Sequence, residues 1–340
     1  MTANNPRVQM REVARHIGVS ISSVSRALND HPDVSALMQD RVRAATKALG
    51  YEPDLLAKSL RKGSTKSIGF LLRDISNPLL AEMVKGSEEV FEGLGYSTLL
   101  ADCDGAEDLE ARCILTLRKR RVDGLILSLQ SETRQLTLDA LRATTCPMVL
   151  LDREVPGLRA GVVLCDHESG VGAATADLFA VGHTRIAMIG GPEGIRTTRE
   201  RLRGFQRAHH ERSMEPDPAL VRLGSYAKDV GRQQTLDLMG ERRPPTAIVA
   251  GGAQLAVGAL SALHELGLAI GGDVSLVACD EIDLMALLHP PVSVVWRDPR
   301  SMGRIAAELL VGMIVRGEEA QTVEIPTVYV KRGSVQPPSR

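Results

Sequence analysis

The sequence predicts an all-α head at the N-terminus, followed by a larger α/β core that contains two parallel sheets. Residues 1–66 show only helical patterns, whereas from Ile68 onward short apolar runs alternate with amphipathic stretches. This alternation is typical of doubly wound parallel sheets, in which helices cover both faces. The β–α units are numerous enough for two such sheets side by side, and 340 residues exceed one ordinary domain.

Three helices are expected in the head. The first covers residues 10–17 and ends at Gly18, the second begins near Ser20, and the third covers residues 35–50. Gly50 is expected to end the third helix, because glycine readily adopts the left-handed conformation of a helix C-terminus.

The core is expected to alternate strands with helices. The expected strands are the apolar runs 68–72, 96–101, 123–129, 146–152, 185–191, 246–252, 274–279 and 292–295. The expected helices are the amphipathic stretches 79–95, 107–120, 169–182, 199–213, 256–267 and 300–317.

Composition is that of a globular protein. Apolar residues make up 44% of the chain and aromatic residues only 3%, so packing must rely on Leu, Val, Ile and Ala. No apolar run approaches the roughly 20 residues of a membrane-spanning helix, and the first ten residues lack the apolar segment of a signal peptide. The five cysteines are scattered and lack metal-ligand spacing, which favours reduced thiols. We therefore expect a cytoplasmic, nucleoid-associated protein with no membrane partner.

Charge is divided unevenly along the chain, although the net charge is only −1. Residues 1–66 carry 11 Lys and Arg against 6 Asp and Glu, whereas the remaining residues carry 30 against 36. A basic head on an acidic body favours a polyanionic partner for the head. On charge alone, a solvated charged face is an equally good interpretation.

The head also has the residue pattern of a helix-turn-helix. Ala14 allows two helices to approach closely, and Gly18 supplies the unusual backbone of the turn. Ser20 is placed to cap the second helix, whose Val24, together with Ala27 and Leu28, is expected to face the core.

The outer face of the second helix suits a DNA major groove. Its side chains are small, so the helix can lie deep in the groove, hydroxyls can reach phosphates, and Arg26 can pair bidentately with a guanine edge. The alternative is an ordinary three-helix cap with a serine-rich solvent face. The candidate DNA-contacting residues are Ser20, Ile21, Ser22, Ser23, Ser25, Arg26 and Asn29.

Residues 11–89, together with "GHTRIAMIGGP", "DVSLVACDE" and "VYVKRGS", resemble transcriptional repressors of the LacI/GalR type. The resemblance covers essentially the whole chain. It implies a helix-turn-helix domain (1–50), a hinge helix and linker (51–66) and an effector-binding core (67–340) similar to periplasmic sugar-binding proteins. The core would divide into an N-lobe (about 67–164 plus 296–322) and a C-lobe (about 165–295 plus 323–340).

The resemblance also assigns a role to residues 53–63, which on their pattern alone are a plain basic linker. They would fold into a helix when two subunits dock on operator DNA. Leu60 would then insert between minor-groove base steps, with Ala57, Lys58 and Arg61 beside it.

In the core, the resemblance implies an effector between the lobes, near the carboxyl ends of parallel strands. The candidate effector-binding residues are Leu79, Leu80, Asp152, Thr197, Arg201, Tyr226 and Asp280. Arg201 can bind paired hydroxyls or a carboxylate, and Asp280 can accept from two sugar hydroxyls. The alternative for these two residues is an ion pair between the lobes without a ligand.

Two departures from the family pattern bear on the effector. Leu79 and Leu80 stand where family members often carry aromatic residues, so a flat base fits less well than a sugar, polyol or sugar acid. Gly252 and Ala253 replace the polar residues that commonly precede the next helix. Either the effector is smaller or less hydroxylated, or the pocket has diverged from the family pattern. The expected effector is a sugar, sugar acid or phosphosugar.

Other motifs carry no chemistry of their own. The glycine loops at 190–194 and 251–258 match neither a dinucleotide-binding nor a P-loop pattern, and are expected to be tight turns. His209 and His210 are adjacent on a helix and so point apart, which disfavours a metal site. No catalytic set can be assembled, so we expect no enzyme, no cofactor and no metal.

The sequence thus predicts a homodimeric, ligand-responsive repressor that binds a pseudo-palindromic operator. Effector binding would change the angle between the lobes and thereby the hinge helices. One alternative is a regulator of the same fold that is controlled by a protein partner or has no small-molecule effector. Another, from a different class, is a solute-binding protein.

Overall fold

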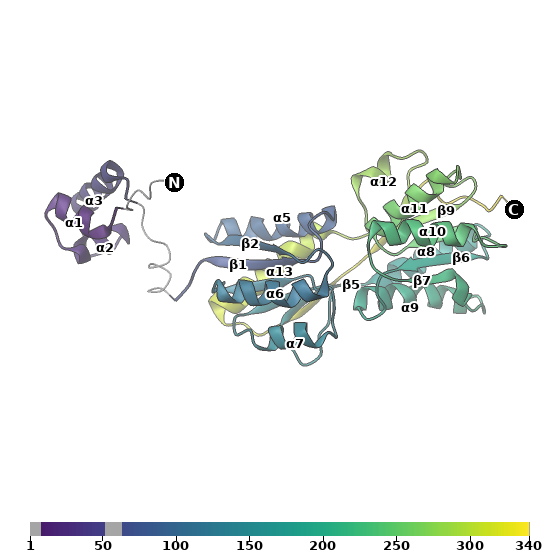
Figure 1. The fold of residues 1–340 in the computed structure, drawn as a ribbon, viewed down its shortest axis with the longest axis horizontal. Helices are drawn as coiled ribbons and strands as arrows, with labels where there is room; N and C mark the ends of the chain where they lie inside the picture. Colours follow the sequence, from purple (N-terminus) through teal and green to yellow (C-terminus); the bar gives the residue numbers. More distant parts are fainter. Residues whose placement is uncertain (1–7, 52–62, 340) are drawn as a thin grey trace. The chain divides into compact units, whose positions relative to one another are not determined.

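The computed structural model describes residues 8–51 and 63–339 (Figure 1). The chain divides into two compact units, Met1–Thr65 and Lys66–Arg340. Among the described residues, no helix combines the length and the apolar character needed to cross a bilayer.

The first unit contains the three expected helices. They are α1 (Met10–Ile17), α2 (Ile21–Leu28) and α3 (Ala36–Leu49). Their small core contains the fully buried Val13, Val24 and Val42. Gly50 follows α3 with φ 64°, so the left-handed helix end is confirmed.

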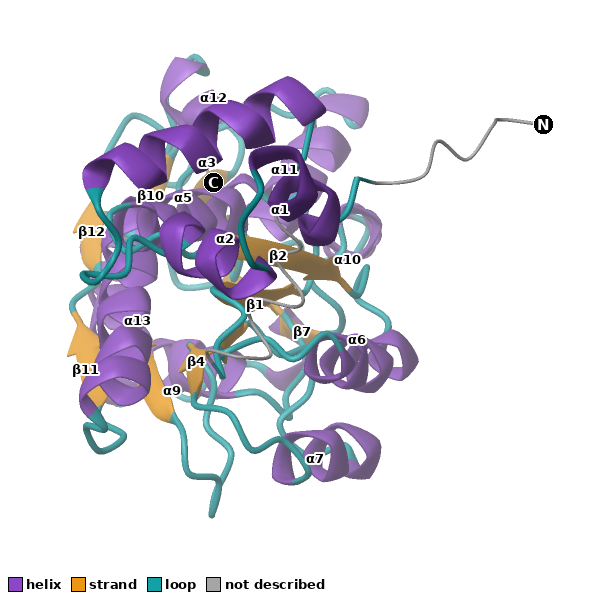
Figure 2. Ribbon diagram, turned by 90° about the vertical axis from the view of Figure 1, so that its left-hand side faces the viewer, coloured by secondary structure: helices purple, strands orange, loops and turns teal. Residues whose placement is uncertain are grey.

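The N-lobe of the second unit is a six-stranded, fully parallel sheet in the order β11-β5-β4-β3-β1-β2. Its strands are β1 (Ser67–Leu72), β2 (Ser97–Asp102), β3 (Gly124–Leu127), β4 (Met148–Leu151), β5 (Gly161–Cys165) and β11 (Thr322–Ile325). The helices α5 (Pro78–Glu92) and α13 (Pro299–Val311), the latter followed by the π-helical turn η2 (Gly312–Arg316), cover one face, and α6 (Glu107–Lys119) and α7 (Gln135–Arg142) cover the other (Figure 2).

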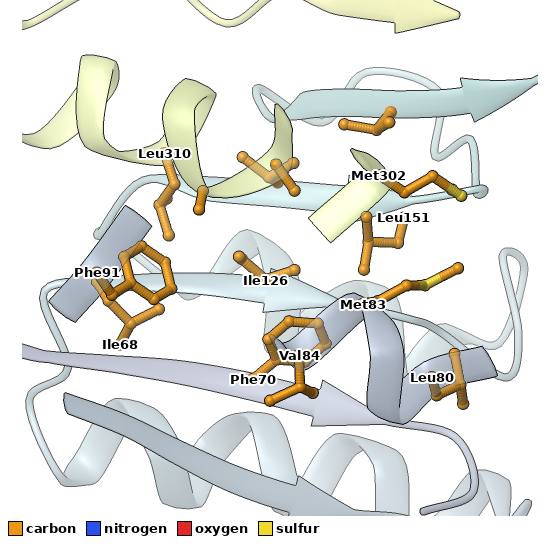
Figure 3. Packing of buried hydrophobic residues seen from close by; sticks show 14 of the residues in the cluster. Ile68, Phe70, Leu80, Met83, Val84, Phe91, Ile126, Leu151, Met302 and Leu310 are labelled. Atoms are coloured by element: carbon orange, nitrogen blue, oxygen red, sulfur yellow. The ribbon is translucent and has the colours of Figure 1, made fainter. Parts of the chain in front are cut away.

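Alternation along β1 explains how this sheet acquires two cores. Phe70 belongs to a cluster with Met83 of α5 and Leu310 of α13 (Figure 3). Leu72, two residues further along β1, belongs to the same cluster. Leu71, between them, packs on the opposite face against the side of α6 and α7. Because both faces are buried, the strand is a continuous apolar run.

The C-lobe is a second six-stranded sheet in the order β12-β10-β9-β8-β6-β7, in which only β12 runs antiparallel to its neighbour. Its strands are β6 (Ile186–Gly190), β7 (Val221–Leu223), β8 (Ala247–Ala250), β9 (Ser275–Cys279), β10 (Ser293–Trp296) and β12 (Val328–Val330). The helices α8 (His167–Ala180) and α9 (Arg196–His210) cover one face, and α10 (Lys228–Met239) and α11 (Ala253–Glu265) cover the other. The short helices are η1 (Pro218–Leu220) and α12 (Asp283–Leu287).

The chain passes between the two sheets after β5, after β10 and after β11. The third passage lies beyond Ile325, so the expected boundary at residue 322 is about three residues too early. The reason is that residues 322–325 pair with β5 and complete the N-lobe sheet.

The two doubly wound parallel sheets are confirmed, and all eight expected strands are present. Among the described residues of the core, four strands (β5, β7, β11, β12), three α-helices (α7, α10, α12) and the short helix η1 lie outside the expected set. The strands β7, β11 and β12 have only three or four residues and no fully buried residue, so the sequence signal of each is weak. β5 follows β4 without an intervening helix, so the alternation of strand and helix does not predict it.

Candidate DNA-binding helix and ligand cavity

The head turns between α1 and α2 at a left-handed glycine. Gly18 has φ 68° and ψ 35°, a conformation that favours glycine because it has no Cβ. Ala14 and Ala27 are buried where the helices approach one another. The geometry is therefore the helix-turn-helix that the sequence predicts.

At the start of α2, Ser20 is the helix cap. Its Oγ accepts a hydrogen bond from the amide of Ser23 at 3.1 Å and lies 2.7 Å from Oγ of Ser22. The hydroxyl of Ser23 is also 2.8 Å from Oγ of Ser20. Ser20 thus satisfies one free amide of the first turn, and the serine hydroxyls at this end of α2 bond to one another.

The outer face of α2 is exposed at four of its candidate residues. Ile21 is 52% exposed, and Ser22, Arg26 and Asn29 are exposed as well. Ser23 and Ser25 are half-buried. Arg26 and Ile21 therefore extend from the helix on the side away from the core of the head.

The hinge residues Ala57, Lys58, Leu60 and Arg61 lie outside the described residues. Their minor-groove role stays a prediction.

A cavity of about 330 Å³ lies between the N-lobe and the C-lobe, at the carboxyl ends of strands from both sheets. A cleft at this edge is the usual ligand position in open α/β folds. The lining includes all seven candidate effector-binding residues, namely Leu79, Leu80, Asp152, Thr197, Arg201, Tyr226 and Asp280. The structure therefore brings these residues together, and their contact with an effector stays a prediction.

Arg201 and Asp280 form a buried ion pair, with 3.0 Å between Nη2 and Oδ2. Both residues belong to the C-lobe, so the alternative of an ion pair between the lobes is wrong for these two. Arg297 makes the connection instead. Its Nη1 lies 2.5 Å from Oδ2 of Asp152 in the N-lobe, and its Nε lies 2.6 Å from Oδ1 of Asp280.

These pairs fix the charges of the buried carboxylates. Burial raises the pKa of Asp280, but Arg297 and Arg201 outweigh it and hold this pKa well below its usual range. Burial likewise raises the pKa of Asp152, and His167 and Arg297 outweigh it there. Both carboxylates are therefore ionised at neutral pH and offer a ligand permanent acceptors.

His167 forms a hydrogen bond with Asp152, with 2.7 Å between Nε2 and Oδ2. Burial lowers the pKa of His167 to about 4 against the opposing effect of Asp152, so the ring is neutral at pH 7. Asp152, Cys165 and His167 hold three potential metal-binding atoms within 4.8 Å of one another. Arg297 already occupies this cluster, because its Nη1 bonds Asp152 and lies 3.5 Å from Sγ of Cys165.

Tyr226 lies in a slot between two glycine loops. A Cβ on Gly191 would come within 2.2 Å of Cζ of Tyr226, and a Cβ on Gly252 would come within 3.0 Å of its Cδ1. The Tyr226 hydroxyl is 2.9 Å from Oγ1 of Thr198. Gly252 therefore leaves room for the tyrosine ring, which explains why no polar side chain stands at that position.

Further contacts join the two lobes beside the cavity. Nη1 of Arg153 in the N-lobe donates to Oγ1 of Thr197 in the C-lobe at 2.9 Å. The buried Glu132 accepts from the backbone amide of Arg196 at 3.0 Å and pairs with Arg199 at 3.1 Å. The two lobes are thus joined by polar contacts, and one of them, Arg153–Thr197, lines the cavity where a ligand can alter it.

Three arginines of the cavity were not among the candidates: Arg73, Arg153 and Arg297. Arg73 directly follows β1, and Arg297 directly follows β10. Arg153 is the second residue after β4, next to Asp152. The rule that places ligands at strand ends therefore applies to them as it does to Asp152 and Asp280.

Comparisons with known proteins agree with this architecture. Residues 9–54 match the model of the bacterial regulatory proteins of the lacI family, and residues 175–335 match a periplasmic binding protein-like domain. The ribose operon repressor of Escherichia coli (strain K12) is 31% identical over 327 residues, which cover 96% of this chain and 99% of the repressor. The HTH-type transcriptional repressor PurR of Aliivibrio fischeri (strain MJ11) is 30% identical over 332 residues, which cover 96% and 98%.

Solved structures give the same result. The lac repressor dimer bound to operator and the anti-inducer ONPF has a TM-score of 0.82 at 26% identity, with coverage of 97% of this chain and 99% of that chain. A LacI family transcriptional regulator from Enterococcus faecium with bound ribose has a TM-score of 0.69 at 25% identity, with coverage of 80% and 99%. Together with the head and the two-lobed core, these matches show that the chain belongs to the lacI family of bacterial regulatory proteins.

Proposed function

We propose that this protein is a homodimeric repressor that binds a pseudo-palindromic operator and responds to a small molecule held between its lobes. One observation carries the proposal: the chain joins a helix-turn-helix with an exposed polar helix to a core with a charged cavity between two lobes. Two heads on a two-fold dimer read two half-sites, which accounts for the symmetry of the operator.

Helix α2 is proposed to lie in the major groove. Arg26 would read a guanine edge, and Ser22 and Ser25 would contact phosphates or neighbouring bases. Ile21 and Asn29 flank these residues on the same helix, while Ser20 and Ser23 hold its first turn in shape. The hinge residues Ala57, Lys58, Leu60 and Arg61 would add minor-groove contacts.

The effector is proposed to be a sugar, sugar acid or phosphosugar that contacts both lobes. Asp152 and Asp280 are ionised acceptors for hydroxyl groups, and Arg201 is a donor fixed by Asp280. Thr197 adds a hydroxyl, while Leu79, Leu80 and Tyr226 contribute apolar surface.

Regulation follows from the contacts between the lobes. An effector that replaces or strengthens contacts such as Arg153–Thr197 changes the preferred angle of the lobes. Through the dimer and the hinge, this angle would set the affinity of the heads for DNA. Thermodynamic linkage requires that operator DNA change the affinity for the effector by the same factor.

The proposal excludes catalysis. The cavity carboxylates are held in ion pairs with depressed pKa values, which makes them poor proton acceptors at neutral pH. A protein partner in place of a small molecule is the alternative within the same fold, and a solute-binding protein is the alternative from another class. The polar, ligand-sized cavity favours a small molecule.

Operator selection from random DNA, followed by binding assays with and without a sugar panel, tests the proposal. The expected result is a palindromic site whose affinity changes with one compound, and equal coupling when effector binding is measured with and without DNA. Absence of any specific site contradicts the proposed function. A specific site whose affinity no compound changes favours the protein-partner alternative.

A further inference from the structure

Arg73 faces the cavity without a charged partner. Within the described part of the chain, its guanidinium forms no ion pair, and its Nε is buried without a hydrogen-bond partner. The guanidinium makes a cation–π contact with the ring of Tyr226 across the cavity, with 4.6 Å between the guanidinium carbon and the ring centroid. A guanidinium in such a place costs free energy unless something else satisfies it.

Arg153 is the second guanidinium at the cavity that lacks a carboxylate. It donates to the carbonyl of Leu129 at 2.7 Å, to its neighbour's carbonyl at 2.7 Å and to Oγ1 of Thr197 at 2.9 Å. All three acceptors are neutral. Burial and the nearby Arg153 lower the pKa of Arg73 to about 10, so the two positive charges act on one another.

The acids of the cavity compensate this charge only in part, because Asp74 and Asp280 raise the pKa of Arg73 by less than burial and Arg153 lower it. Asp152 and Asp280 are already paired with Arg297 and Arg201. Asp74 is half-exposed and its Oδ1 accepts from both the amide and the hydroxyl of Ser76, while Asp104 is exposed. The cavity wall near Arg73 therefore carries positive charge that no ion pair within the described residues neutralises.

Unsatisfied polar atoms gather at the same cavity. Six buried side-chain atoms in the described residues lack a partner, and three of them belong to cavity residues: Arg73, Gln130 and Arg201. Buried polar groups are normally hydrogen-bonded, so such a concentration indicates a place that a polar ligand completes.

We propose that the effector is an anion, with a carboxylate or phosphate group docked against Arg73 and Arg153 and a hydroxyl-bearing body directed toward Asp280 and Arg201. The inference rests on the proposed function, because it requires that the cavity bind an effector. A planar guanidinium binds either oxyanion through paired hydrogen bonds, so the two kinds of anion share one chemistry. The volume of about 330 Å³ lies at the small end of ligand sites, which suits a compact anion.

Calorimetric titration of the full-length protein with matched ligands tests this inference. The probes are D-glucose, D-gluconate and D-glucose 6-phosphate, then D-galactose and D-galactonate, then D-ribose and D-ribose 5-phosphate. At least one anion is expected to bind about tenfold or more tightly than its neutral counterpart. Acids and phosphates form separate arms, so the panel distinguishes the two sources of the oxyanion.

Two variants localise the effect. Arg73→Gln removes the guanidinium charge and is expected to abolish the preference for the anion over its neutral counterpart. Arg112→Gln removes an exposed guanidinium from α6 of the same lobe and is expected to change neither affinity. The comparison of matched ligands on the unaltered protein does not depend on the folding of either variant.

The inference is overturned if every neutral sugar binds at least as tightly as its acid and phosphate. It is also overturned if Arg73→Gln folds and keeps the full preference, or if no probe binds. Operator binding by the unaltered protein is measured in parallel. Loss of the preference with intact operator binding contradicts only the anionic effector, whereas absence of specific operator binding contradicts the proposed function.

Discussion

Arg297 and Asp152 form a buried ion pair, with 2.5 Å between Nη1 and Oδ2. Arg297 begins the segment that returns from the C-lobe sheet to α13, and Asp152 directly follows the strand β4 of the N-lobe. The pair therefore connects the passage from β10 to α13 with the cavity wall of the N-lobe. The same guanidinium also binds Asp280, so one cation serves carboxylates of both lobes.

Removal of that cation is expected to destabilise the core strongly. Arg297→Met leaves Asp152 with His167 and with Arg196, whose Nη1 is 3.7 Å from Oδ1, and it leaves Asp280 with Arg201 alone. Removal of one partner of a buried ion pair costs about 3–5 kcal/mol. Urea denaturation at pH 7, followed by the fluorescence of the single tryptophan Trp296, measures the change in the free energy of unfolding.

Arg304→Met is the matched control, because Arg304 is exposed on α13 and bonds only the nearby Ser301. Its expected effect is below about 0.5 kcal/mol. Equal losses in both variants would show that the Arg297 pairs add nothing to stability.

The stability of the core is expected to fall as the pH drops from 6.5 to 4. The pKa of His167 is lowered from 6.5 to about 4 in the folded chain. In that window the unfolded chain binds the proton and the folded chain does not, so stability decreases toward acid by up to about 1.4 kcal/mol per pH unit. Below about pH 4 this histidine contributes no further change.

The His167→Asn variant separates this residue from other buried histidines. His183 and His209, whose pKa values are also lowered by burial, contribute to the same window and remain in the variant. The plot of unfolding free energy against pH should therefore be shallower for the variant but not flat. An unchanged slope would assign the whole pH dependence to other groups.

The sequence predicts the fold well because buried strands require apolar residues, which form recognisable runs in the sequence. β1 and β8 are buried on both faces and so appear as unbroken apolar runs, while Gly18 and Gly50 mark the ends of helices in the left-handed conformation. The edge strand β11 has no such signal, because its residues are only half-buried or exposed. That is also why the third passage between the lobes could not be placed correctly.

The site is predictable in part for a related reason. Family resemblance supplies Arg201 and Asp280, and the strand-end rule supports them. The role of Arg297 depends on which carboxylates meet it in space, which requires the passage from β10 to α13 to be known. The slot for Tyr226 likewise depends on two glycines, at 191 and 252, that are 61 residues apart in the chain and meet only in the folded C-lobe.

Arg26→Ala is expected to relax operator specificity. If Arg26 reads a guanine edge, its loss costs about 1–3 kcal/mol of discrimination at one symmetric pair of base positions. Competition binding against operators with a single altered base pair per half-site measures this. Lys47→Ala, at an exposed cation in the last turn of α3, is the control for general electrostatic attraction and should weaken all sequences alike.

The assignment of Arg26 is wrong if Arg26→Ala leaves the discrimination intact while Ser25→Ala abolishes it. In that case the base contact belongs to the serine, and Arg26 contacts the phosphates.

Gly191→Ala is expected to displace Tyr226 from the cavity wall. The new Cβ would lie 2.2 Å from Cζ of the ring, so the ring must move, and crowding of this kind costs about 1–3 kcal/mol. Gly194→Ala, three residues later in the same loop, meets no atom within 4 Å and is expected to leave the free energy of unfolding within about 0.5 kcal/mol.

A double-mutant cycle of Gly191→Ala with Tyr226→Ala gives the decisive measurement, because removal of the ring removes the clash. The two substitutions together should then destabilise the protein by less than the sum of their separate effects. Additive losses would mean that Gly191 is required for its own backbone rather than for the tyrosine beside it.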